Sequence, residues 1–179
     1  MRPPRWVLTA ALVIAVEAYL FRRYSQLGAV FHFWLHGLFG AALGFFALTV
    51  VTLVRRRRVG DVWTAGFLGH VYSAAPDVAF LTVGVLHYLW MDVFAFHVSL
   101  HFVPAPLVTM FSVFAFSVTA WAAATLGRRR IAAGLLALAV AVTSVALAVR
   151  RPIPDTLTEL RADPSLALLC PLAPWTVSG

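Results

Sequence analysis

Histidines recur at a helical spacing in this chain. His32 and His36 lie four residues apart in one apolar stretch, and His97 and His101 repeat that spacing further along. Residues four apart in an α-helix share a face, one turn apart, so each pair would present two imidazoles side by side. Neutral imidazoles are ligands for zinc and iron. Each pair therefore predicts part of a metal site.

Carboxylates accompany these histidines in otherwise apolar sequence. His70 and Asp77 are seven residues apart, which also places them on one helix face, and Glu17 lies inside the first apolar stretch. Ionisable groups inside a bilayer are costly, so they usually face the protein interior and mark a functional site. The metal ligands that this pattern predicts are His36, His70, Asp77, His97 and His101.

The remaining polar side chains give the expected site its chemistry. Three of them are candidates for additional ligands or for groups that orient the ligands: His32, His87 and Asp92. Zinc held by three protein ligands keeps an open position and lowers the pKa of its bound water to about 7. Glu17 would act as general base or orient a ligand histidine. We therefore expect a metal-dependent hydrolase that uses zinc, with iron or haem b as the alternative cofactor.

Cysteine usage excludes several other kinds of site. Cys170 is the single cysteine. One cysteine allows no intrachain disulfide, no Cys-x-x-Cys redox pair, no c-type haem attachment and no thiolate zinc cage. Any metal must therefore be bound by histidine and carboxylate.

The elements that position these residues are predicted from the apolar runs. Of the 179 residues, 61% are hydrophobic and 12% are charged, which indicates lipid as the main solvent. The chain is predicted to be an all-α membrane bundle (residues 1–151), with about five transmembrane helices at 6–21, 27–54, 62–84, 107–127 and 131–149. Residues 85–103 are expected to form an outer interfacial or re-entrant helix. The proline-rich tail, 152–179, is expected to be irregular, with at most one short helix near 156–161.

The basic residues behind the net charge of +7 predict how the chain is oriented across the membrane, and they do not indicate a nucleic-acid partner. The 14 basic residues are all arginines, and they lie in short runs between apolar stretches. With the amino terminus in the cytoplasm, nine arginines lie inside and five outside, as the positive-inside rule favours. We expect a multi-pass protein of a bacterial-type plasma membrane. The first apolar stretch is expected to remain as a helix, because Glu17 interrupts it and no small-residue cleavage site follows.

Depth in the bilayer is a second indication of where these polar residues lie. With a rise of about 1.5 Å per residue, Asp77 lies roughly 22 Å above the cytoplasmic start of its helix and His70 roughly 12 Å. His36 lies roughly 12 Å below the outer start of its own helix. The metal site is therefore expected in the outer half of the membrane.

Short motifs carry a resemblance to a known family. His36-Gly37 lies on an early helix, Pro76-Asp77-Val78 follows His70, and a later segment with His and Asp, 87–106, ends in prolines. In these features the chain resembles the bacterial inner-membrane metal-dependent hydrolases, which are small multi-pass proteins. The resemblance covers about a third of the chain and implies a metal-dependent hydrolase.

Other functions remain open at this point. Two histidines from different helices, such as His36 and His97, could ligate a b-type haem. The same polar residues could form a metal or proton carrier, or a structural network in a subunit that binds another protein. The partners expected are the lipid bilayer and a membrane-associated or lipid substrate, with a phosphoester, an amide or a lipid headgroup as the group attacked.

Overall fold

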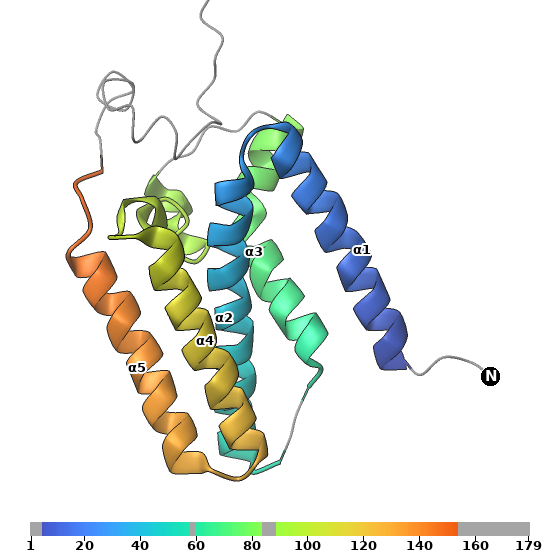
Figure 1. The fold of residues 1–179 in the computed structure, drawn as a ribbon, viewed down its shortest axis with the longest axis vertical. Coiled ribbons are helices and arrows are strands. Elements are labelled where there is room, and N and C mark those ends of the chain that lie inside the picture. The colour runs from blue at the N-terminus through green and yellow to red at the C-terminus, as the bar shows by residue number, and fades with distance from the viewer. Residues whose placement is uncertain (1–4, 58–59, 84–88, 154–179) are drawn as a thin grey trace, which may run out of the picture.

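The computed structural model describes residues 5–57, 60–83 and 89–153, and every regular element in these residues is a helix. The predicted fold class is confirmed to that extent. Figure 1 shows the helices arranged as a bundle around α2. The elements are α1 (Arg5–Gln26), α2 (Val30–Arg55), α3 (Val62–Val83), the short 3-10 helices η1 (Leu89–Val93) and η2 (Ser99–Phe102), α4 (Pro106–Thr125) and α5 (Arg129–Ala148).

Three of the described helices are long and apolar enough to cross a membrane: α2, α4 and α5. The sequence predicted five such spans, so two expected spans do not reach this standard. α1 carries Glu17, Arg22 and Arg23 within its length. α3 carries His70 and Asp77. Both helices therefore contain polar residues that the sequence pattern singled out.

Glycines let α2 and α3 touch backbone to backbone. A Cβ added to Gly40 would lie 2.3 Å from the carbonyl oxygen of Gly69, and one added to Gly69 would lie 1.9 Å from the carbonyl oxygen of Gly40. One turn along α2, a Cβ on Gly44 would lie 2.1 Å from the carbonyl oxygen of Ala65. Small residues four apart are a common device for close helix crossing in membranes. This crossing sets the antiparallel register of α2 and α3.

α4 and α5 form a hairpin that packs on the other side of α2. Gly127 turns the chain between them with a φ of 74°, a left-handed conformation in which glycine carries no steric penalty. The core of this half is a cluster of buried side chains from α2, η2, α4 and α5. It includes Leu35 and Phe39 of α2, Leu100 of η2, and Met110 and Val113 of α4.

The described residues between α3 and α4 form a compact turn instead of one regular helix. Ala95 and Phe96 adopt left-handed backbone conformations, with φ of 59° and 55°. Asp92 stabilises this turn, since its carboxylate accepts hydrogen bonds from the backbone nitrogens of Val98 and Ser99 at 2.8 and 2.9 Å. Over residues 89–102 the expected interfacial or re-entrant helix is therefore replaced by two short 3-10 helices, with His97 in the turn between them and His101 on the second.

The connections lie at two opposite ends of the bundle (Figure 1). The α2–α3 and α4–α5 connections share one end, while the α1–α2 turn and residues 89–105 share the other. Arginines 55–57 and 128–130 therefore lie at the first end, and the pairs 22–23 and 150–151 lie at the second. The expected helix near 156–161 and nearly all of the tail fall outside the described residues.

Candidate metal centre

Three histidines converge at the second end of the bundle. His36 comes from α2, His97 from the turn after η1, and His101 from η2, and their exposed fractions are 0%, 0% and 8%. One ligand nitrogen from each lies within 4.8 Å of the other two. Zinc at about 2.1 Å from each nitrogen holds two such atoms up to about 4.2 Å apart. Small side-chain movements would therefore bring all three onto one ion.

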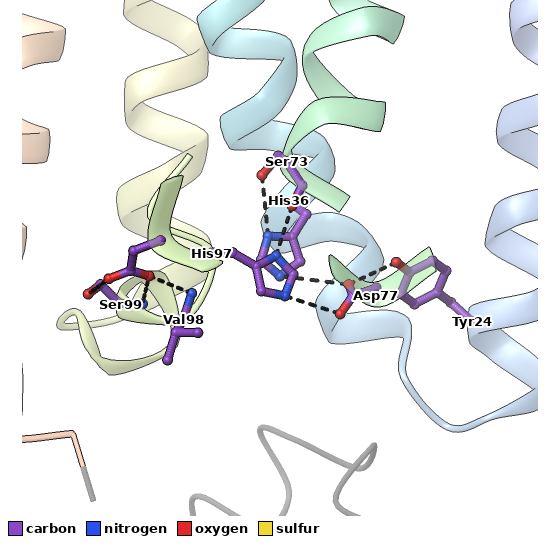
Figure 2. A network of polar contacts seen from close by, with 8 residues as sticks. Tyr24, His36, Ser73, Asp77, His97, Val98 and Ser99 are labelled. Atoms are coloured by element: carbon purple, nitrogen blue, oxygen red, sulfur yellow. Dashed lines mark hydrogen bonds and ion pairs between the residues drawn. The ribbon is translucent and has the colours of Figure 1, made fainter. Parts of the chain in front are cut away.

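Asp77 of α3 adds a fully buried carboxylate beside this triad. Its Oδ1 lies 3.2 Å from Nε2 of His97, and its Oδ2 lies 3.9 Å from Nε2 of His36. The imidazoles of His36 and His97 are stacked, with centroids 3.9 Å apart and an angle of 10° between planes. Figure 2 shows the carboxylate facing the edge of this stack. The centre thus combines nitrogen and oxygen donors from three separate elements.

Ser73 lies beside the stacked rings and contacts both of them (Figure 2). Its backbone carbonyl accepts a hydrogen bond from Nδ1 of His97 at 2.8 Å, and its Oγ lies 3.3 Å from Nδ1 of His36. A carbonyl only accepts, so Nδ1 of His97 must carry a proton. In the neutral ring, Nε2 then holds a lone pair directed at the carboxylate of Asp77. A proton on Nε2 or a nearby cation would stabilise this contact with the carboxylate, 3.2 Å away.

Tyr24, at the carboxyl-terminal end of α1, holds the other oxygen of this carboxylate. Its hydroxyl donates to Oδ2 of Asp77 at 2.8 Å, and the side chain is 1% exposed. The phenol thus acts as a hydrogen-bond donor to the buried carboxylate.

Two further candidates lie near the centre without belonging to the triad. The ring of His32 packs on that of His101, with centroids 4.6 Å apart, so it flanks one ligand. Asp92 uses its carboxylate on the turn that carries His97, where Oδ2 also accepts from the Ser99 hydroxyl at 2.6 Å. Asp92 thus positions the turn. The third candidate, His87, lies outside the described residues.

His70 pairs with Glu17 instead of joining the triad. Its Nδ1 lies 2.8 Å from each oxygen of the Glu17 carboxylate, and its ring contacts the edge of Phe33. Both this pair and the Tyr24–Asp77 pair join residues 53 apart in sequence. α1 and α3 therefore run parallel and are joined at two levels, about 10.5 Å apart along the helices. That rise separates His70 from Asp77.

The predicted site is thus divided in two by the structure. Of the five expected ligands, four come together: His36, Asp77, His97 and His101. The contacts made by Tyr24 and Ser73 were not predicted. The available signal was their spacing, since Tyr24 follows Glu17 by seven residues, as Asp77 follows His70, and Ser73 lies between His70 and Asp77.

Comparisons of the chain with protein-family models, with curated proteins and with solved structures gave no match. The resemblance to the inner-membrane hydrolases therefore rests on the short His and Asp motifs. The geometry of the buried histidine and aspartate centre is the main support for a function.

Proposed function

We propose that this chain is a multi-pass membrane protein that binds a divalent metal ion, preferably zinc, at His36, His97 and His101. We also propose that it hydrolyses a membrane-associated substrate. The observation that carries the proposal is the convergence of three buried imidazole nitrogens within 4.8 Å beside a buried carboxylate. Three histidines and an open fourth position are a ligand set of catalytic zinc.

The electrostatics of the centre support a cation there. Ser73 holds a proton on Nδ1 of His97, so in the neutral ring Nε2 is the nitrogen that would face a metal ion. The buried Asp77 carboxylate, with Oδ1 3.2 Å from that nitrogen, would add negative charge beside the ion. A second proton on His97 is the competing explanation, and metal analysis distinguishes the two.

The side chains around the triad have defined roles in this proposal. Zinc would supply an acidified water at its open position. Asp77 Oδ1 would accept a proton from that water, as a general base next to the ligands. The Tyr24 hydroxyl would remain hydrogen-bonded to Oδ2 of Asp77 and so hold the carboxylate in one orientation. The substrate class is that of the sequence prediction: a phosphoester, an amide or a lipid headgroup that reaches the outer face.

The stacking of His36 and His97 favours an ion over haem b. Axial ligation of one haem needs two imidazoles on opposite faces of the porphyrin, with the iron between them. Rings stacked at 3.9 Å with planes 10° apart leave no room for a porphyrin between them. A compact ion needs no such separation.

The proposal places the protein in a bacterial-type plasma membrane with its amino terminus in the cytoplasm. The two connections rich in arginine lie at one end of the bundle, as the positive-inside rule requires. We propose that α1 and α3 also cross, with their polar residues facing inward. Large apolar side chains on both helices are exposed, among them Leu12 and Ile14 of α1 and Leu68 of α3, which suits contact with lipid.

Metal binding tests the first half of the proposal. The full chain, purified in detergent and dialysed against zinc, manganese or iron, should retain about one equivalent of metal. His97→Ala should lower the affinity by at least tenfold. His70→Ala, which removes another buried histidine, should leave the stoichiometry unchanged. Equal loss in both variants would refute the ligand set, and substoichiometric metal in the wild type would refute the site.

Hydrolysis tests the second half. The metal-loaded protein should cleave a chromogenic phosphodiester, an ester or an amide in lipid nanodiscs, and Asp77→Asn should lower kcat by about 100-fold, the usual contribution of a positioned base. The variant should still bind metal through the three histidines. Stoichiometric metal with no hydrolysis of any of the three substrates would instead favour a carrier or a structural subunit.

A further inference from the structure

An open apolar groove lies between α4 and α5, apart from the metal centre. Its volume is about 450 Å³. The lining residues come from α5 and the residue after it, from the first turn of α4, and from a proline two residues before α4; they include Pro104, Thr109, Ala141, Val142, Val145 and Val149. Both helices are among those that are long and apolar enough to cross a membrane. The groove therefore faces the hydrocarbon of the bilayer.

The length of the groove suits one acyl chain. Ala141 and Val149 are eight residues apart on α5, which is about 12 Å along the helix. One leaflet contributes about 15 Å to the hydrocarbon core. The groove thus extends from the end of α5 most of the way to the middle of the bilayer.

Two arginines follow Val149, at the end of the groove that lies at the carboxyl terminus of α5. Arg150 and Arg151 are both exposed. The guanidinium of Arg150 donates to the carbonyl oxygen of Leu147 at 3.1 Å, and the backbone nitrogen of Arg151 donates to the carbonyl oxygen of Phe102 at 2.9 Å. Residues 106–153 contain no Asp or Glu, so no carboxylate in α4 or α5 neutralises these charges. The pair is held where a lipid headgroup would lie.

We propose that this groove binds an anionic phospholipid, with one acyl chain along Val142 and Val145 and the phosphate at Arg150 and Arg151. The charge of the arginines selects an anionic headgroup over a zwitterionic one. Arginine also binds phosphate oxygens through two parallel hydrogen bonds. Because Arg151 is bonded to Phe102, the bound lipid would brace the segment that carries His101.

Native mass spectrometry of the full chain, titrated with dioleoyl phosphatidylglycerol or dioleoyl phosphatidylcholine, tests the headgroup. The wild type should bind phosphatidylglycerol about tenfold more tightly, as expected for one to two arginines near a phosphate. R150Q/R151Q should abolish this preference. R129Q/R130Q, which removes the same charge from the other end of α5, should keep it. No preference in the wild type, or equal loss in both variants, would overturn the proposal.

The groove itself is tested by filling it. Val145 lines the groove and is 61% exposed, whereas Val140 lies on the same helix outside the lining and is 49% exposed. Val145→Trp should weaken phosphatidylglycerol binding severalfold, and Val140→Trp should not. Equal binding by both variants would contradict an acyl-chain site. Dimers of the wild type that dissociate in Val145→Trp would show that a second copy occupies the groove, which would also overturn the proposal.

Discussion

Ser73 and Tyr24 contribute to the centre without being ligand candidates. Ser73 contacts both stacked histidines from one side, and Tyr24 holds the carboxylate of Asp77 from the other. Groups that orient metal ligands commonly change metal affinity by 10-fold to 100-fold when removed. The side chain of Ser73 and its backbone carbonyl act on different rings, so mutation separates the two contacts.

Ser73→Ala should lower zinc affinity by about tenfold, because it removes the Oγ contact with His36 and keeps the carbonyl contact with His97. Isothermal titration of the purified variant measures the change. Ser117→Ala, at a buried serine of α4, is the matched control and should bind zinc like the wild type. An unchanged affinity in Ser73→Ala would mean that His36 needs no such partner.

Tyr24→Phe should lower the free energy of unfolding by about 1.5–3 kcal/mol, because a buried carboxylate loses a hydrogen bond. Unfolding in mixed detergent micelles measures this. Tyr19→Phe, at a tyrosine of the same helix that is 62% exposed, should change stability by less than about 0.5 kcal/mol. If the two variants are equally stable, the Tyr24–Asp77 contact contributes nothing.

At the scale of elements, the crossing of α2 and α3 brings the site together. Gly40 lies one turn after His36, and Gly69 lies one turn before Ser73. Backbone contact at the glycines therefore sets the distance at which His36 and Ser73 meet. The Gly40-x-x-x-Gly44 spacing was visible in the sequence, but spacing alone does not identify the partner helix.

Gly40→Ala should destabilise the protein by about 1–3 kcal/mol, since its Cβ would lie 2.3 Å from the Gly69 carbonyl oxygen and the helices would have to separate. The same separation should lower zinc affinity. Gly134→Ala is the control, because nothing lies within 4 Å of its Cβ, and alanine there should be neutral or stabilise α5 by about 0.5–1 kcal/mol. Thermal unfolding of both variants in one detergent decides the outcome, and equal behaviour would exclude a specific role of the crossing.

For the whole molecule, the distribution of connections predicts which residues face which side of the membrane. Arg57 and Leu126 lie in the two connections that share one end, and Trp90 lies at the opposite end. All three positions are exposed. If the arginine-rich end is cytoplasmic, the histidine centre lies nearer the outer surface.

Single cysteines at these positions, with Cys170 replaced by serine, test this topology in intact cells. A membrane-impermeant maleimide should label Trp90→Cys from outside, and should label Arg57→Cys and Leu126→Cys only after the cells are opened. The opposite pattern would invert the orientation. Labelling of Arg57→Cys and Leu126→Cys from different sides would contradict the arrangement of the hairpins.

The sequence by itself determined that the chain is helical and apolar and that His36, His97 and His101 are candidates for one site. Helical periodicity and hydropathy are local properties, and arginine runs follow the apolar stretches close to where α2, α4 and α5 end. Only the tertiary structure decided that His70 pairs with Glu17, and that Ser73 and Tyr24 join the centre. These contacts depend on the register between helices, which the Gly40–Gly69 contact and the parallel pairing of α1 with α3 establish. Two residues on one helix face point in the same direction, but residues seven apart are still separated by about 10.5 Å along the helix axis.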